Sequence, residues 1–132
     1  MDVIMNETEK VTVNLSVVDL GQIDLLVDEG LYSNRTDCIR ASIRLQLNQH
    51  NDVVKQAVFR KSLTIGVLMF DKASLEKARI EGRRLVIRAI GMVILAGDIP
   101  ADLAREAIES IHVKGVLRAS TAVREAMHDR IS

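Results

Sequence analysis

The sequence predicts an α+β protein in two parts, an N-terminal strand–helix–helix unit followed by a small β-α repeat-like C-terminal domain. Residues 10–16 alternate polar and apolar side chains, and the apolar positions of residues 17–60 then follow helical spacing. Beyond residue 62, segments rich in Ile, Val and Leu alternate with short helical patterns. We therefore expect a mobile arm over residues 1–9, a first domain over residues 10–60 and a second over residues 62–132.

The composition fits a folded protein and excludes several functions. Of the 132 residues, 48% are hydrophobic and 27% are charged, so the chain can bury a core beneath a polar surface. Aromatic residues make up only 2%, which nearly excludes the stacking platforms that bind single-stranded nucleic acid. The longest apolar stretch, residues 89–97, is far shorter than the roughly 20 residues of a membrane span, so we expect no membrane partner.

The cysteine content and the first residues indicate a compartment. Cys38 is the only cysteine, so it has no partner for an internal disulfide. The N-terminus lacks the basic segment and apolar run of a secretion signal. We expect a cytoplasmic protein in which Cys38 is a small core residue rather than a reactive thiol.

The first domain begins with a strand that has one face to bury. Apolar side chains on one face alternate with polar side chains on the other: Val11, Val13 and Leu15 against Lys10, Thr12 and Asn14. The pattern then predicts a helix from Val17 to a cap at Gly30, and a second helix that Ser33 caps. The second helix has an apolar stripe formed by Ile39, Ile43 and Leu47. Val54 and Val58 could continue this stripe.

The second domain shows a loose internal repeat. Strands are predicted over residues 63–70, 85–95 and 111–117, each followed by a helix that begins near Ser74, Pro100 or Ser120. Each strand contains a glycine, and these lie 25 and 24 residues apart: Gly66, Gly91 and Gly115. Repeated β-α units of this size predict stacked or parallel strands with helices on the other side.

The order of elements in residues 10–48 resembles a known family. A strand of alternating pattern, a helix ending in Asp28-Glu29-Gly30, and Tyr32-Ser33-Asn34-Arg35-Thr36-Asp37 leading into Ile39-Arg40 follow one another. This sequence of features is similar to the ribbon-helix-helix family of DNA-binding regulators, the MetJ/Arc/CopG-like group. The resemblance implies a homodimer formed through the N-terminal strand and helices, with the two strands paired as an antiparallel ribbon.

The resemblance also implies how double-stranded DNA is bound. The ribbon fits the major groove, where Lys10, Thr12 and Asn14 of each chain would read base edges. Ser33, Asn34 and Arg35, at the start of the second helix, would hold a phosphate. Other roles remain open for several of these residues. Thr12 and Asn14 also fit the solvated face of an ordinary sheet, and Ser33 also fits a simple helix cap.

The charge distribution opposes tight DNA binding. Residues 1–60 contain six basic and nine acidic residues, a net charge of −3, whereas residues 61–132 contain twelve basic and nine acidic residues, a net charge of +3. DNA affinity depends largely on basic side chains that displace counterions. We therefore expect weak, salt-sensitive binding by the first domain.

We expect no metal, no cofactor and no enzymatic activity. Nickel-responsive repressors join a similar DNA-binding unit to a C-terminal sensor, but the three histidines here, His50, His112 and His128, lack the His-x-His pair and nearby cysteine of such sensors. No nucleophile with a suitably placed base and no phosphate loop is present in the sequence.

The sequence therefore predicts a transcriptional regulator or a related antitoxin-like DNA-binding protein. Residues 62–132 would join dimers into a higher oligomer, so that several ribbons engage adjacent half-sites. The alternative is a protein–protein scaffold in which the ribbon-helix-helix unit serves mainly for dimerisation.

Overall fold

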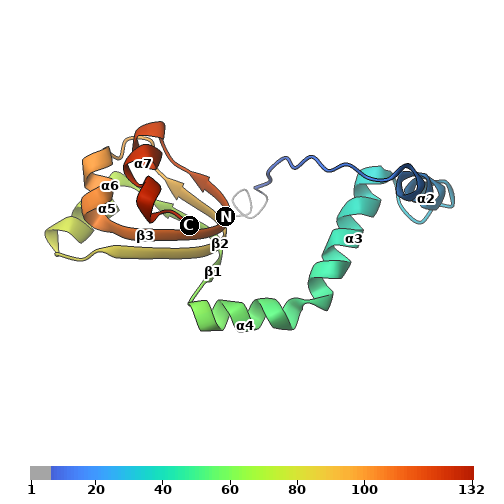
Figure 1. Cartoon of the computed structure of the whole chain (residues 1–132), viewed down its shortest axis with the longest axis horizontal. Coiled ribbons are helices and arrows are strands. Elements are labelled where there is room, and N and C mark those ends of the chain that lie inside the picture. The colour runs from blue at the N-terminus through green and yellow to red at the C-terminus, as the bar shows by residue number, and fades with distance from the viewer. Residues whose placement is uncertain (1–6) are drawn as a thin grey trace. The chain divides into compact units, whose positions relative to one another are not determined.

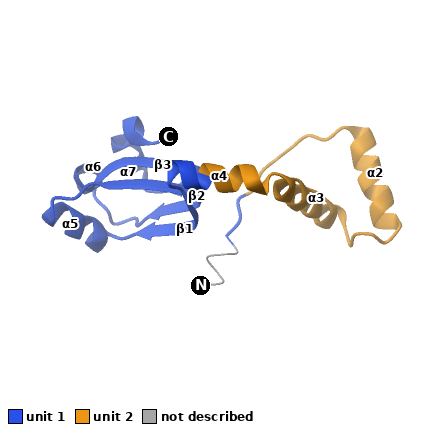
Figure 2. Ribbon diagram, turned by 90° about the horizontal axis from the view of Figure 1, so that it is seen from below, with its two compact units in different colours: residues 1–9, 58–132 blue, residues 10–57 orange. Residues whose placement is uncertain are grey.

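The computed structural model describes residues 7–132, which form two compact units (Figure 1). One unit holds residues 10–57, and the other holds residues 58–132 together with residues 7–9 (Figure 2). Helices combined with one small sheet confirm the predicted α+β class. No helix in the described range has the length and apolar composition that crossing a bilayer requires.

Helix α2 (Val17–Asp28) begins and ends as the sequence predicts. The Ser16 hydroxyl caps it by accepting a hydrogen bond from the Asp19 N–H at 3.1 Å. At the other end, Gly30 has a φ of +82°, a conformation in which a side chain would be strained. The N–H groups of Gly30 and Leu31 donate to the carbonyls of Val27 and Leu26, the pattern of a Schellman cap.

Helix α3 (Arg35–Gln49) differs from the prediction at both ends. Asn34, not Ser33, is the N-cap, and its Oδ1 accepts from the Asp37 N–H at 2.9 Å. Asn34 has extended backbone immediately before the first helical residue, which places Ser33 one position too early. The chain then leaves the helix at His50 and starts a separate helix, α4 (Asn51–Lys61), so the predicted stripe is divided between two helices.

The second unit is a parallel sheet of three strands in the order β1-β2-β3, with helices on one face (Figure 1). Its elements are β1 (Thr64–Phe70), α5 (Lys72–Ile80), β2 (Leu85–Leu95), α6 (Ala101–Ala107), β3 (Ile108–Arg118), α7 (Thr121–Ala126) and the 3-10 turn η1 (His128–Arg130). The prediction of parallel strands with helices on one side is confirmed. The core between sheet and helices is aliphatic, and its largest fully buried side chains are Leu75, Val93, Ile108, Ile111, Val123 and Met127.

The caps of these short helices agree with the sequence at one position and differ at another. Ser120 caps α7 by accepting from the Val123 N–H. Asp71 rather than Ser74 caps α5: its carboxylate accepts from the Ser74 N–H at 2.8 Å, and the Ser74 hydroxyl accepts from the Asp71 N–H at 3.1 Å. Ser74 therefore completes a reciprocal capping box from inside the helix instead of starting it.

The repeated glycines form a row across the sheet. Gly66 pairs with Gly91, and Gly91 pairs with Gly115, so the three lie at one level of the three strands. All have positive φ, at +134°, +131° and +129°. A Cβ on Gly91 would lie 2.2 Å from the Gly66 carbonyl oxygen, and one on Gly115 would lie 2.0 Å from that of Gly91. All three positions favour glycine by their positive φ, and Gly91 and Gly115 also require it because the neighbouring strand approaches closely.

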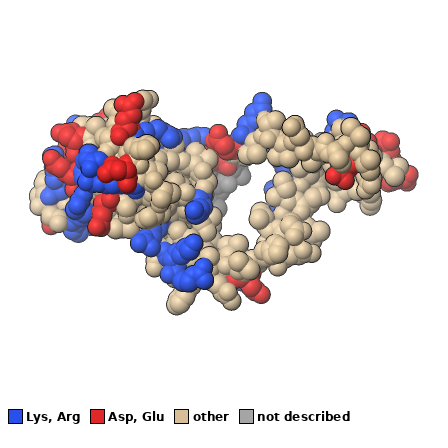
Figure 3. Space-filling model, in the orientation of Figure 1, with Lys and Arg blue, Asp and Glu red and all other residues tan. Residues whose placement is uncertain are grey.

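The outer surface of the helices carries charges of both signs. Lys and Arg are interspersed with Asp and Glu over the helical side of this unit (Figure 3). Ion pairs join the elements there, with Arg79 to Glu106 at 3.3 Å and Arg105 to Asp129 at 2.9 Å. Exposed pairs of this kind add little stability, but they balance the charge of this face.

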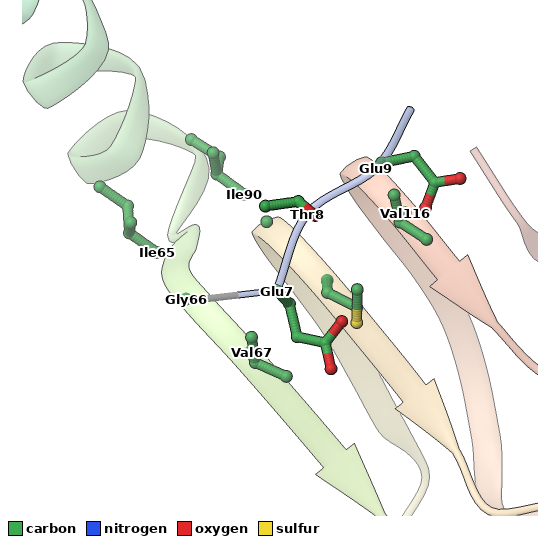
Figure 4. Close-up of a pocket in the computed structure, with 10 residues that line it drawn as sticks. Glu7, Thr8, Glu9, Ile65, Gly66, Val67, Ile90 and Val116 are labelled. Carbon is green, nitrogen blue, oxygen red and sulfur yellow. The ribbon is translucent and has the colours of Figure 1, made fainter. Parts of the chain in front are cut away.

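Within residues 7–132, no helix covers the opposite face of the sheet, and this face carries several exposed apolar side chains. Ile65 and Met69 are 63% and 62% exposed on this side. Residues 7–9 pass over its centre, above Val67, Ile90 and Val116 (Figure 4), and Glu7 pairs with Arg118 at 3.4 Å. A hollow of about 420 Å³ remains beside them. Of the predicted mobile arm, residues 1–6 lie outside the described residues, and residues 7–9 contact this sheet.

The glycine row predicts a graded set of stabilities. Gly91→Ala introduces both a clash with backbone and a strained φ, and should lower the free energy of unfolding by at least about 2 kcal/mol. Gly66→Ala adds only the strained φ, because nothing lies within 4 Å of its Cβ position, and should cost less. Gly97→Ala, with open space around it, is the matched control. Urea unfolding followed by circular dichroism measures all three, and equal values for Gly91→Ala and Gly97→Ala would contradict the account.

Candidate nucleic-acid interface

The segment before α2 is exposed on both of its faces. Lys10, Thr12 and Asn14 face solvent, and so do the alternating apolar residues Val11 and Val13, which are 77% and 69% exposed. Residues 10–16 form neither helix nor strand within the single chain, which differs from the predicted strand. The physical reason is that a strand needs a neighbour to accept and donate its hydrogen bonds, and none of β1, β2 and β3 pairs with residues 10–16. Pairing with a second chain stays a prediction.

The unit of residues 10–57 lacks a core of its own. Cys38, at 3% exposure, is its only buried residue, which fits the predicted role of this side chain. Large apolar side chains of the same unit remain exposed: Val11, Val13, Leu15, Val17, Val18, Leu25, Leu26, Leu31, Ile43, Leu45, Leu47 and Val53. A segment of this size needs a buried apolar core or an oligomer to be stable. The exposed side chains therefore indicate that this unit folds against a second copy.

The start of α3 offers backbone donors to an anion. Asn34 Oδ1 is used by the Asp37 N–H, and the Asn34 carbonyl accepts from the Cys38 N–H at 3.2 Å. The N–H groups of Arg35 and Thr36, in the first turn, have no partner inside the helix, as is general for first-turn donors. Ser33 is exposed beside this turn. Asp37 in the same turn places a negative charge close to where a phosphate would lie.

Arg35 is already engaged in an ion pair. Its Nε and Nη2 donate to the two carboxylate oxygens of Asp24 at 2.7 and 2.9 Å, which joins α3 to α2. This two-pronged hydrogen bond lowers the pKa of Asp24 and raises the pKa of Arg35 from their ordinary values. Any stabilisation from the pair is therefore present above the ordinary aspartate pKa and is lost as the pH falls through the lowered one. Sequence analysis did not find this contact, because Asp24 is one of several acids with no spacing rule relating it to Arg35.

Other basic residues of α3 remain available. Arg40 and Arg44 are exposed, and no carboxylate within residues 7–132 lies within 4 Å of either guanidinium. Neither of them pairs with Asp37, which lies on the same helix. Over the same residues, no three His, Cys, Asp or Glu side chains gather as a metal site would require.

These features together define a class of protein. A segment with alternating faces, two capped helices joined by a glycine turn, and an apolar surface that needs a second copy make a dimerisation unit of the strand–helix–helix type. The sequence model of the Ribbon-Helix-Helix transcriptional regulator family matches residues 6–124, and the chain belongs to this family. Membership implies DNA binding and dimerisation. No curated protein and no solved structure matches the chain.

The family match extends well beyond the DNA-binding unit. It includes β1, α5, β2, α6 and β3, whereas the sequence motif itself covers only residues 10–48. The unit of residues 58–132, called the sheet domain below, is therefore largely included in the family model and is not an unrelated addition to this chain.

Two neighbouring residues test the need for a second copy. Val13→Lys places a charge on the apolar face and should abolish association through residues 10–16, because the charge would be buried without a partner. Any association through the sheet of the second unit would remain. Thr12→Lys adds the same charge to the polar face and should leave the dimer intact. Sedimentation velocity at micromolar concentration distinguishes the species. If both variants associate equally, the apolar face of residues 10–16 is not buried against a second chain.

Proposed function

We propose that the protein is a sequence-specific transcriptional regulator whose dimer inserts an antiparallel β-ribbon into the major groove of double-stranded DNA. The observation that carries the proposal is the alternation in residues 10–16, which lead directly into the capped helix α2 of a family member. Pairing two such segments covers both sets of apolar side chains and aligns the polar ones on the outer surface.

The side chains of the polar face suit the chemistry of base edges. Lys10 would donate to guanine O6 or N7, and Asn14 would form two hydrogen bonds with adenine N6 and N7. Thr12 would contact a thymine methyl group or a neighbouring acceptor. All three side chains are exposed in the single chain, and so are available to a groove.

Ser33, Asn34 and Arg35 would hold the flanking phosphate. The free first-turn N–H groups of α3 and the positive end of its dipole favour an anion there. Arg35 would have to share its guanidinium between Asp24 and the phosphate, which fits the weak, salt-sensitive binding expected from the charge of this domain.

The sheet domain would join dimers into a higher oligomer. The apolar face of its sheet is only partly covered by residues 7–9, and Ile65, Met69 and Val86 remain exposed on it. A second copy of the same face would cover these side chains and place two ribbons on adjacent half-sites, which raises the effective affinity without new DNA contacts. In the sedimentation experiment above, a plain dimer for the unchanged protein would contradict this role.

A second function is favoured by one observation. Because Arg35 is neutralised by Asp24 in a domain of negative net charge, the unit also fits a scaffold or antitoxin-like protein that uses it mainly to dimerise.

Asn14→Ala and Thr12→Ala separate the two functions. For a regulator, each lost base contact should reduce discrimination between specific and random duplexes by about 1–3 kcal/mol while the dimer persists. Fragments selected from random DNA at low and at physiological salt supply the specific duplex for a fluorescence titration. If neither change alters binding to any duplex, the scaffold function is supported and the regulator is not.

Asp24→Asn tests the role given to Arg35. Removing the carboxylate frees the guanidinium, so DNA binding should tighten and its salt dependence should steepen by about one unit of log–log slope per added phosphate contact. Asp28→Asn is the matched control, because it removes the same charge from the same helix without touching Arg35. Identical gains in both variants would mean that net charge alone acts and that Arg35 holds no phosphate.

A further inference from the structure

Four side chains that carry or can carry positive charge meet at one hollow of the sheet domain. The hollow has a volume of about 160 Å³ and is lined by Lys61, Leu63, Arg88, His112, Lys114 and Ser132. These residues come from the last turn of α4 and the connection that follows it, from β2 and β3, and from the segment after η1. None of these lining residues has an acidic side chain. Figure 3 shows Lys and Arg together over the last turn of α4, in contrast to the mixed charges over the helices of this unit.

Backbone and side-chain contacts hold these groups in place. Arg88 and His112 are register partners on neighbouring strands, and Lys114 follows two residues later on the same face as His112. Arg88 Nη1 donates to the Lys61 carbonyl at 3.2 Å, and His112 Nδ1 hydrogen-bonds to the Ser132 hydroxyl. Ser132 is itself fixed, because its N–H donates to the Ile111 carbonyl and its carbonyl accepts from the Val113 N–H.

The lysines and the arginine of this cluster form no ion pair within the described part of the chain. Arg79, Arg83, Arg105 and Arg118 of the same unit each pair with a carboxylate. By contrast, Lys61, Arg88 and Lys114 have no carboxylate within 4 Å among residues 7–132. Like charges gathered in a concave surface repel one another, and a bound anion removes that repulsion.

We propose that this cluster is a binding site for a phosphate group. Lysine supplies a point charge and arginine a planar pair of donors, the combination that suits phosphate oxygens. Water occupies about 30 Å³ per molecule in the liquid, so the hollow has room for about five waters, close to the five heavy atoms of one phosphate. His112 and Ser132 add hydrogen-bonding groups at its wall, and Leu63 closes one side.

A bound phosphate would act on the connection between α4 and β1. Lys61 is the last residue of α4, and Ser62, which follows it, has a φ of +54° that is uncommon for a residue with a side chain. A phosphate shared by Lys61, Arg88 and Lys114 would hold the last turn of α4 against β2 and β3. The phosphate belongs either to a small phosphorylated molecule or to the DNA backbone.

Calorimetric and thermal titration of the full chain with inorganic phosphate and with adenosine 5′-monophosphate tests the site. We expect saturable binding that raises the melting temperature with ligand concentration. Lys114→Gln should weaken binding at least about tenfold, since it removes a charge-assisted contact. Lys72→Gln, the same charge change at the start of α5, should not. The melting temperature of Lys114→Gln without ligand should equal or exceed that of the unchanged protein, which separates lost binding from lost folding.

Titration with duplex DNA identifies the source of the phosphate. If Lys114→Gln also weakens DNA binding equally for all sequences and lowers the salt slope by about one, the DNA backbone supplies it. If DNA binding is unchanged while binding of free phosphate is lost, the ligand is a small phosphorylated molecule. Absence of saturable binding of phosphate, monophosphate and DNA at this site, or equal losses in Lys114→Gln and Lys72→Gln, would overturn the proposal. The site can bind free phosphate whether or not the protein recognises DNA. Failure of the regulator function would therefore appear in the DNA titrations and not in the phosphate titration.

Discussion

We infer that the first unit depends on one interaction, the pairing of two chains along residues 10–16. In one chain, most of the large apolar residues of this segment and of α2 and α3 are exposed, and only Cys38 is buried. A second copy would give the segment its hydrogen-bonding neighbour and give the helices a core. The same pairing would align Lys10, Thr12 and Asn14 of both chains on one outer face. Folding, dimerisation and DNA recognition would then follow from a single contact.

The second unit is built on a different principle. It has its own aliphatic core and a row of three glycines at one level of its parallel strands, so each chain completes this domain by itself. The open face of its sheet has two parts: an apolar part around Ile65 and Met69, and the cationic hollow around Arg88 and Lys114. The first suits contact with another copy, and the second suits an anion. Such a domain can add assembly and a ligand to the DNA-binding unit without sharing its core.

The sequence predicted features that depend on local pattern and missed those that depend on tertiary contact. The cap at Gly30 and the spacing of Gly66, Gly91 and Gly115 were predictable, because positive φ and close strand approach both require glycine. The shift of the cap from Ser33 to Asn34 was not, because either side chain can accept the bond and the local helix start decides between them. The Asp24–Arg35 pair, 11 residues apart, was missed because no local pattern relates its members. The cationic hollow was missed because residues from α4, β2, β3 and the segment after η1 meet there only after the chain folds.

Hydrogen exchange at the backbone amides of residues 10–16, measured over a range of protein concentrations, tests the dimer most directly. A paired ribbon protects amides that bond across the two strands, and protection should disappear together with the dimer on dilution. The account predicts slow exchange at high concentration, rising toward the rate of an open peptide as the chains separate. Fast exchange at every concentration, in a protein whose α2 and α3 amides remain protected, would contradict it.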